Sequence, residues 1–339
     1  MTQHHITLIF EDGVTSVVAA GPGETVYQAA ARQNVPIQTD CREGACAVCA
    51  ATCVSGTYDL LDFSDEALTP QDQARGGVLA CRMRATSDCV LEMPYPSGAI
   101  ALKDAAARAV VVSELDEVAQ NVVRLVLNEA DGVPMAFLPG QYVNIEVPGT
   151  GRARSYSFAN APLASGGHEF FIRRLDRGLM SDWLAAGAAA GIGTQISAPR
   201  GQFFLRPTDR PLLMVAGGTG LAPMLSMLAH IKSGGGPRPA KITVLYGTNT
   251  AGEMFGLDRL AELSGDLPIE VRTAVVSPPY AGTVGHVTGL LEPQMLEGGE
   301  TQVYLCGPPP MVQAARAFLD QSNHPARHIF AERFLPSAA

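Results

Sequence analysis

The stretch DCREGACAVCA, residues 40–50, contains three of the seven cysteines of this chain. Cys41, Cys46 and Cys49 are spaced as C-x4-C-x2-C, and Cys81 follows as a fourth cysteine in the segment VLACRM. The residues between the first three are mostly small, so the backbone can pass close to whatever the sulfurs bind. Clustered thiols in a chain without an export signal are more typical of metal ligands or reactive groups than of disulfides.

Four cysteines at this spacing are typical of the ligands of a [2Fe-2S] cluster. Four thiolates, two sulfides and two ferric ions together carry a charge of roughly −2, so the loop must supply backbone N–H donors. A structural zinc ion or buried free thiols are the alternatives, but zinc sites favour two CxxC pairs and this chain has one. The predicted metal ligands are Cys41, Cys46, Cys49 and Cys81. Cys53 and Cys89 fit no ligand spacing and are expected to be small core residues.

The composition describes a folded chain of several domains. With 339 residues, 47% of them hydrophobic, the chain is too long for one core, and no run of about eighteen apolar residues could span a bilayer. The net charge of −9, without a lysine- or arginine-rich block, argues against a nucleic-acid partner. The start MTQHHITLIFEDG lacks the basic and apolar segments of a secretion signal, so a cytoplasmic location is expected.

The pattern of elements changes twice along the chain. Near the N-terminus two alternating strands join at Asp12–Gly13, and a helix follows with Thr25 as its N-cap. A linker is expected at about 94–104. Residues 105–206 contain regularly spaced strands and one helix, which indicates a small antiparallel barrel. From residue 210 strands and helices alternate, as in a parallel sheet covered by helices.

The strand RARSYSFAN carries side chains that suit a flavin nucleotide. Arg154 and Tyr156 alternate onto one face, where a guanidinium can bind a pyrophosphate and a ring can stack. An ordinary barrel strand with a charged end is the alternative for this motif alone. The segment GLMSDWL adds Gly178 and Ser181 at the start of a helix, where free N–H groups favour a phosphate.

Two motifs in the last third of the chain suit a nicotinamide nucleotide. VAGGTGLAP follows a strand and opens a helix, although its G-x-G-x-x-P pattern is not the Rossmann fingerprint. YLCGPPPM ends a later strand, so both motifs lie at the carboxyl edge of the sheet, where such folds bind ligands. A buried structural cysteine is the alternative for Cys306. Glu253 and Asp258 precede Arg259 after the second strand of this region, which favours NADH over NADPH.

CREGACAVC and VLACRM resemble the plant-type ferredoxin domain of oxygenase reductases, although that family usually has glycine at the position of Ala47. RxYS with GxxS, and VAGGTGLAP with YLCGPPPM, resemble the ferredoxin-NADP reductase superfamily. The resemblance implies a multidomain fold of α+β and α/β type. Its parts are a β-grasp [2Fe-2S] ferredoxin domain (1–97), an antiparallel FAD-binding β-barrel (104–207) and a parallel-sheet α/β NAD-binding domain (208–339).

The same resemblance implies roles for individual residues. Arg154 and Ser181 would hold the FAD pyrophosphate, Tyr156 would pack on the isoalloxazine, and Ser157 would hydrogen-bond near its N5 atom. Cys306 would lie beside the nicotinamide, Phe334 would cover the flavin and Glu332 would be a nearby polar group, so the catalytic set is Cys306, Ser157 and Glu332. From the residues alone, IFAERFLPSAA reads as an amphipathic C-terminal strand. The other cofactor-binding residues implied are Ile172, Arg173, Gly178, Leu179 and Met180 for FAD, and Gly218, Thr219, Gly220, Pro223, Gly307 and Pro308 for NADH.

The order of the three domains resembles the reductase component of benzoate-, toluate- and anthranilate-type ring-hydroxylating dioxygenases over essentially the whole chain. That resemblance implies electron flow from NADH through FAD and the [2Fe-2S] cluster to the Rieske centre of a separate terminal oxygenase. A flavin is required between NADH and the [2Fe-2S] cluster. NADH gives up two electrons at once and the cluster accepts one at a time, whereas a flavin can do both. The alternatives are the reductase of a soluble di-iron monooxygenase, a non-enzymatic electron carrier and a zinc-stabilised binding module.

Overall fold

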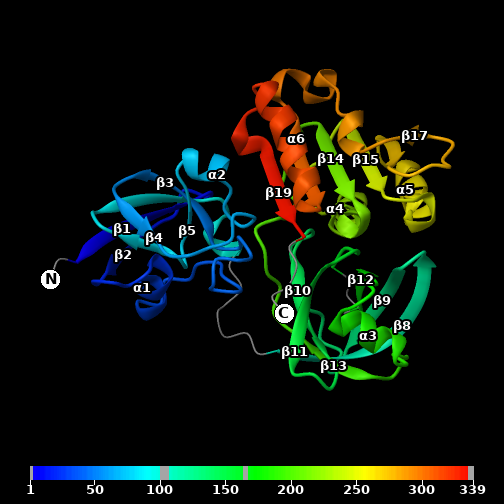
Figure 1. The fold of residues 1–339 in the computed structure, drawn as a ribbon, viewed down its shortest axis with the longest axis horizontal. Coiled ribbons are helices and arrows are strands. Elements are labelled where there is room, and N and C mark those ends of the chain that lie inside the picture. The colour runs from blue at the N-terminus through cyan, green and yellow to red at the C-terminus, as the bar shows by residue number, and fades with distance from the viewer. Residues whose placement is uncertain (1–2, 100–106, 163–166, 335–339) are drawn as a thin grey trace. The chain divides into compact units, whose positions relative to one another are not determined.

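The computed structural model describes residues 3–99, 107–162 and 167–334. Contacts within the chain divide it into two compact units, residues 1–105 with Arg200–Gln202, and residues 106–199 with 203–339. The expected linker at about 94–104 lies partly outside the described residues. Figure 1 shows a mixed sheet in the first unit, and a barrel and a helix-covered sheet in the second.

The first unit is built on a five-stranded sheet in the order β2-β1-β7-β3-β5. The predicted N-terminal hairpin is present, since β1 and β2 pair antiparallel around Gly13, whose φ is +79°. The first strand also pairs parallel with β7, which gives the β-grasp arrangement. Its elements are β1 (His4–Phe10), β2 (Thr15–Ala20), α1 (Val26–Arg32), β3 (Ala50–Ser55), β4 (Tyr58–Leu60), α2 (Pro70–Ala74), β5 (Gly77–Leu79), β6 (Met83–Ala85), β7 (Cys89–Met93) and η1 (Ser97–Ala99).

Capping decides where the helices of this unit begin. Thr25 accepts a hydrogen bond from the Gln28 N–H, and the Gln28 side chain accepts one from the Thr25 N–H, which completes a capping box. Thr69 and Asp72 form the same motif at α2. The predicted N-cap at Thr25 is therefore confirmed.

The first half of the second unit is a six-stranded antiparallel sheet in the order β11-β10-β13-β8-β9-β12, and β11 and β12 contact each other so that the sheet curls into a barrel. Apolar side chains from every strand but β11 fill its interior, and Tyr156 of β11 packs against them. The elements are β8 (Arg108–Ala119), β9 (Val122–Glu129), β10 (Tyr142–Val147), β11 (Arg152–Ser157), β12 (Gly167–Arg173), α3 (Leu179–Ala185) and β13 (Gly193–Ile196).

The second half is a parallel sheet in the order β17-β16-β15-β14-β18-β19. Its central strands β14, β15 and β18 are buried along their whole length, as expected when helices cover both faces. The chain proceeds outward from β14 to β17 and then crosses to β18, so the order reverses beside β14. The strands are β14 (Leu212–Gly217), β15 (Ile242–Thr248), β16 (Ile269–Val275), β17 (Thr283–Val284), β18 (Gln302–Gly307) and β19 (Ile329–Arg333).

Helices α4 and α5 pack on one side of this sheet, and α6 with η4 and η5 packs on the other (Figure 1). The expected C-terminal strand is present as β19, parallel to β18. The helical elements are η2 (Gly218–Gly220), α4 (Leu221–Lys232), η3 (Ala251–Glu253), α5 (Leu257–Ser264), η4 (Val287–Leu290), η5 (Pro293–Gly299), α6 (Pro309–Gln321) and η6 (Ala326–His328).

Candidate functional sites

The loop between α1 and β3 brings the four predicted metal ligands together as two pairs. The sulfurs of Cys49 and Cys81 are 3.3 Å apart, and those of Cys41 and Cys46 share a hydrogen bond. Cys49 directly precedes β3 and Cys81 follows β5, and these strands are neighbours, so the sheet holds the second pair. The first pair belongs to the loop itself and is partly exposed.

Backbone N–H groups point at the sulfurs of this loop. The N–H groups of Glu43 and Ala45 donate to Cys41 Sγ at 3.5 and 3.4 Å, and the Cys41 N–H donates to Cys46 Sγ at 3.5 Å. The Cys46 thiol, together with these N–H groups, lowers the pKa of Cys41 to about 5. The loop therefore stabilises negative charge on Cys41, whereas the hydrogen bond that Cys46 shares with Cys41, together with burial, raises the pKa of Cys46.

Two sulfur pairs suit two iron ions rather than one zinc ion. Zinc needs its donors around a single point, and no group of three or more His, Cys, Asp or Glu side chains converges in that way within the described residues. Each pair can hold one iron of a [2Fe-2S] cluster, which supplies one-electron transfer when bound. The four cysteine sulfurs therefore fit a [2Fe-2S] cluster. Cys89 is buried as predicted, and Cys53 is half-buried.

The backbone of the loop is left-handed at Arg42, Gly44 and Ala47, with φ of +62°, +76° and +59°. A Cβ at Gly44 would lie 2.7 Å from Phe63 Cβ and 3.0 Å from Arg82 Cγ, so no larger residue fits there. Ala47 fits, but an L-residue in this conformation costs about 1–2 kcal/mol. The backbone conformation thus gives a physical reason for the glycine usual at the Ala47 position.

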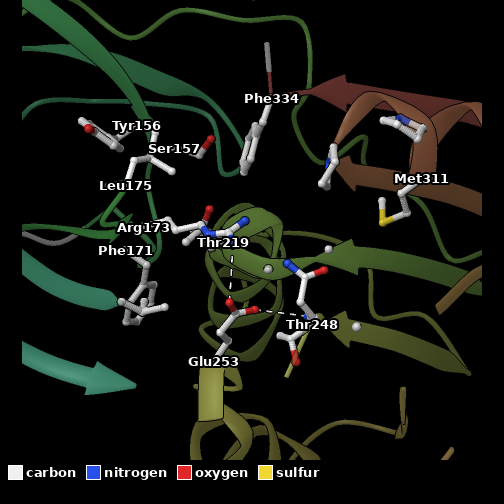
Figure 2. Close-up of a pocket in the computed structure, with 18 of the residues that line it drawn as sticks. Tyr156, Ser157, Phe171, Arg173, Leu175, Thr219, Thr248, Glu253, Met311 and Phe334 are labelled. Atoms are coloured by element: carbon white, nitrogen blue, oxygen red, sulfur yellow. Dashed lines mark hydrogen bonds and ion pairs between the residues drawn. The ribbon is translucent and has the colours of Figure 1, made fainter. Parts of the chain in front are cut away.

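A cavity of about 890 Å³ lies within the second unit. Figure 2 shows Tyr156 and Ser157 on its barrel side, Thr219 in η2 just after β14, Thr248 at the end of β15, and Phe334 above them. The predicted site residues that line the cavity are Arg154, Tyr156, Ser157, Arg173, Gly178, Leu179, Met180, Ser181, Gly218, Thr219, Pro308 and Phe334. The two motif groups that sequence analysis assigned to FAD and to NADH therefore face one space.

The polar groups of this cavity suit a nucleotide diphosphate. The guanidinium of Arg154 donates to the Ala153 carbonyl at 2.9 Å and has no acidic partner among the described residues. Ser181 Oγ accepts from the Leu175 N–H at 2.9 Å, which leaves its own O–H free to donate. Burial raises the pKa of Tyr156, which keeps its ring uncharged. A flavin nucleotide, with its charged diphosphate and flat ring, fits this donor set.

Three residues from distant parts of the chain meet beside the cavity. Ser157 Oγ donates to Glu332 Oε2 at 3.1 Å, and Cys306 Sγ lies 3.9 Å from the same oxygen. Burial raises the pKa of the Glu332 carboxyl to about 8, against the opposing hydrogen bonds from Ser157 and Cys306. Glu332 therefore holds a proton at neutral pH, next to a hydroxyl that lines the cavity. The three residues of the predicted catalytic set are in contact.

The two predicted nucleotide motifs pack backbone against backbone. A Cβ at Gly220 would lie 2.1 Å from the Cys306 carbonyl oxygen, and one at Gly307 would lie 3.1 Å from the Gly217 nitrogen. Only glycine allows β14 and β18 to approach so closely at their carboxyl ends. Phe334 is joined to the same region, because its N–H donates to the carbonyl of Gly307 at the end of β18 at 3.0 Å.

Some predicted residues lie behind the cavity rather than on its surface. Ile172 is fully buried in the barrel core, and the others outside the lining are Gly220, Pro223, Cys306, Gly307 and Glu332. Four lining residues at the sheet edge were not predicted from the sequence, namely Thr248, Asn249, His286 and Thr288. Thr248 and Asn249 were detectable in principle, because they end a buried parallel strand.

A thiolate loop for an iron–sulfur cluster, a flavin-type barrel and a nucleotide-binding sheet define a flavin- and iron–sulfur-dependent reductase. Comparison with known families supports each part. The family described as "2Fe-2S iron-sulfur cluster binding domain" matches residues 9–86, "Oxidoreductase FAD-binding domain" matches 109–205, and "Oxidoreductase NAD-binding domain" matches 214–317.

Relatives with named functions indicate which kind of flavin- and iron–sulfur-dependent reductase this is. The toluate 1,2-dioxygenase electron transfer component of Pseudomonas putida is 38% identical over 99% of both chains. Methane monooxygenase component C of Methylosinus trichosporium is 36% identical over 86% of this chain and 87% of its own length. The chain belongs to the family of reductase components of benzoate-, toluate- and anthranilate-type ring-hydroxylating dioxygenases. It carries electrons from NADH through FAD to a [2Fe-2S] cluster.

The fold has a solved relative. The crystal structure of the Amycolatopsis cytochrome P450 reductase GcoB is 28% identical, with a TM-score of 0.69 over 98% of this chain and all of that one. Within the described part of the chain, no helix is both long and apolar enough to cross a bilayer.

Proposed function

We propose that the acceptor of the electrons is the Rieske centre of a terminal oxygenase that acts on an aromatic ring of the benzoate type. The observation that carries this proposal is the 38% identity to a toluate dioxygenase component over 99% of both chains. A soluble di-iron hydroxylase is the second candidate, because the methane monooxygenase component is 36% identical over a shorter stretch.

We also propose the domain limits 1–97, 104–207 and 208–339, which the three matched family ranges support. The cytoplasm is the proposed compartment, because none of the seven cysteines, all among the described residues, forms a disulfide, as is usual in a reducing environment.

In the proposed flavin site, Arg154 and Ser181 bind the pyrophosphate and Tyr156 packs on the ring. Their support is their joint position on the cavity and the free donors that Arg154 and Ser181 present. Ile172, Arg173, Gly178, Leu179 and Met180 complete this proposed set; Ile172 reaches the site through its backbone only, since its side chain is buried in the barrel core.

In the proposed nicotinamide site, Cys306 and Phe334 flank the place where nicotinamide and flavin meet. If the protonated Glu332 carboxyl donates to Ser157 Oγ, the Ser157–Glu332 hydrogen bond is kept and the Ser157 O–H becomes available to donate toward the flavin ring. The proposed nucleotide-binding residues are Gly218, Thr219, Gly220, Pro223, Gly307 and Pro308.

Reconstitution with purified oxygenases tests the acceptor. With NADH in excess, this protein is expected to support product formation by a benzoate-type Rieske dioxygenase at least tenfold faster than by a soluble di-iron hydroxylase. Oxygen uptake and hydroxylated product are measured together, so that uncoupled oxygen reduction is not counted. Equal rates, or a preference for the di-iron hydroxylase, would assign the protein to the second candidate.

Arg154→Ala tests the flavin site. Loss of a charge-assisted contact to phosphate is expected to weaken FAD binding about ten- to a hundredfold, measured by flavin release on dilution. Arg152→Ala is the matched control, because Arg152 lies on the same strand, is exposed and does not line the cavity. Unchanged FAD affinity in Arg154→Ala would contradict the assignment.

A further inference from the structure

Residues 61–64, which directly follow β4, lie across a turn of the cysteine loop between α1 and β3, and we call them the 61–64 strap. The Ser64 N–H donates to the Gly44 carbonyl at 3.0 Å. At the other end of the strap, the Leu61 N–H donates to the Arg82 carbonyl at 2.9 Å. The strap therefore joins the loop that carries three predicted cluster ligands to the residue directly after the fourth.

The side chain of Arg82 is held against the same turn. A Cβ at Gly44 would lie 3.0 Å from Arg82 Cγ, so the stem of the arginine packs on the backbone of the cysteine loop. Arg82 Nε donates to the Asp62 carbonyl of the 61–64 strap at 2.7 Å. The half-buried side chain is thus fixed at both its stem and its guanidinium, beside the ligand Cys81.

The guanidinium of Arg82 has no carboxylate to neutralise its charge. Within the described residues its side chain makes one hydrogen bond, to the uncharged Asp62 carbonyl. Arg42, which also follows a ligand directly, is exposed, and its guanidinium lies 5.1 Å from the centre of the Tyr27 ring. Arg82 is therefore the arginine that brings an unpaired positive charge against the backbone of the cysteine loop.

A fixed cation at this place acts more strongly on a reduced cluster than on an oxidised one. A [2Fe-2S] cluster with four thiolate ligands carries a charge of roughly −2, which becomes about −3 when it accepts an electron. Because the attraction between two charges grows with the size of each, a nearby cation stabilises the reduced form more than the oxidised form.

We propose that Arg82 is a positioning residue of the cluster site with two separable functions. Its unpaired charge raises the reduction potential of the cluster, and its bond to the 61–64 strap anchors the turn at Gly44. The first function favours the passage of electrons from reduced flavin to the cluster. This inference rests on the four predicted cysteines as ligands of a [2Fe-2S] cluster.

Two substitutions separate charge from anchoring. In Arg82→Gln the amide nitrogen takes the position of Nε, so a donor to the Asp62 carbonyl is kept while the charge is lost. In Arg82→Lys the charge is kept, but a methylene group takes the position of Nε. Arg84→Gln is the matched control for charge, because it removes one arginine from β6, which pairs with β4 rather than with the cysteine loop.

Redox titration of the full-length, FAD-loaded protein tests the charge, with the electron paramagnetic resonance signal of the reduced cluster as the readout. In Arg82→Gln the ratio of reduced to oxidised cluster at a fixed potential is expected to fall about three- to tenfold, which is about 30–60 mV for one electron. Arg82→Lys and Arg84→Gln are expected to stay within about twofold of the wild type.

The rate of cluster loss at elevated temperature, followed by visible absorbance, tests the anchoring. Arg82→Lys is expected to lose its cluster about two- to fivefold faster than the wild type, because one hydrogen bond is missing. Arg82→Gln is expected to lose it at a rate within about twofold of the wild type. If Arg82→Gln does not retain a cluster, Arg82→Met, which keeps the stem on Gly44 without the charge, is titrated in its place.

An unchanged potential in the uncharged variant, or an equal fall in Arg84→Gln, would overturn the proposed effect of charge. Loss of the cluster from Arg82→Lys at the wild-type rate would overturn the proposed anchoring. Failure of the cluster assignment itself is separate, since wild-type protein would then contain no labile sulfide and give no signal after reduction.

Discussion

In the cysteine loop, three of the four predicted metal ligands lie within the nine residues from Cys41 to Cys49, whereas the groups at the cavity of the second unit come from opposite ends of that unit. Ser157 and Glu332, which share a hydrogen bond, are 175 residues apart. The loop shapes its own backbone around the sulfurs with three left-handed residues. The cavity depends on the packing of a barrel against a parallel sheet, since both contribute residues to its lining.

This difference predicts how each site fails. A site made from one loop loses its function when one ligand is removed, but the rest of the protein persists. A site between the barrel and the parallel sheet also depends on the residues that pack these two parts together, even where no ligand touches them.

Cys46→Ser is expected to abolish NADH-dependent reduction of cytochrome c, by more than a hundredfold, because the cluster loses a ligand. Reduction of ferricyanide by NADH is expected to remain largely intact, since it needs only the flavin. Both rates are measured by absorbance on the same sample. Cys53→Ser is the control, because Cys53 lies outside the two sulfur pairs. An equal loss of both activities with the fold preserved would contradict the order of electron flow.

Gly220→Ala is expected to destabilise the second unit by about 3 kcal/mol, because its Cβ would meet the Cys306 carbonyl oxygen at 2.1 Å. Thermal unfolding measures the loss, and NADH reduction of the flavin is expected to fall with it. Gly236→Ala is the control, since a Cβ there meets nothing within 4 Å. A variant as stable as the wild type would show that the two motifs can separate without cost.

Glu332→Gln is expected to flatten the pH dependence of stability. Burial raises the pKa of Glu332 from 4.5 to about 8, so the folded state retains a proton that the unfolded state has lost. The stability from this group is complete below pH 4.5 and is lost as the pH rises through 8. Between pH 5 and 8 the wild type is expected to lose about 3 to 4 kcal/mol of stability relative to the variant.

Thermal unfolding of both proteins, with FAD bound, measures this difference at several pH values. Parallel pH profiles for the wild type and Glu332→Gln would show that the carboxyl is not held in its protonated form.

Ala47→Gly has the smallest expected effect. Glycine adopts φ of +59° without strain, so the cluster loop is expected to gain about 1 kcal/mol. The rate of cluster loss at elevated temperature, followed by visible absorbance, measures it. Ala45→Gly is the control, because Ala45 does not have a positive φ. Faster cluster loss in Ala47→Gly would mean that the alanine methyl group protects the cluster more than its strain costs.

The cluster ligands could be predicted from spacing alone, because a loop of fixed length limits which sulfurs can meet. The hairpin at Gly13 and the N-cap at Thr25 were also predictable, since both depend on neighbouring residues. The lining of the cavity was harder to predict from the sequence. In sequence, Ile172 does not differ in type from its apolar neighbours on β12. Its side chain nevertheless points into the barrel core, because the register of the strand decides which face of the sheet each side chain occupies. The pairing of Arg173 with Glu253 follows from no local pattern.

Short-range patterns in the sequence were enough to predict four thiolate ligands, a flavin-binding strand and two nucleotide motifs, because each depends on the local chain geometry or on backbone close to a ligand. The contacts of Glu332 with Ser157 and Cys306, and of Arg173 with the Glu253 carboxylate, could be known from the three-dimensional structure alone. Those contacts depend on how a barrel and a parallel sheet pack, which is a property of many distant residues together rather than of any one segment.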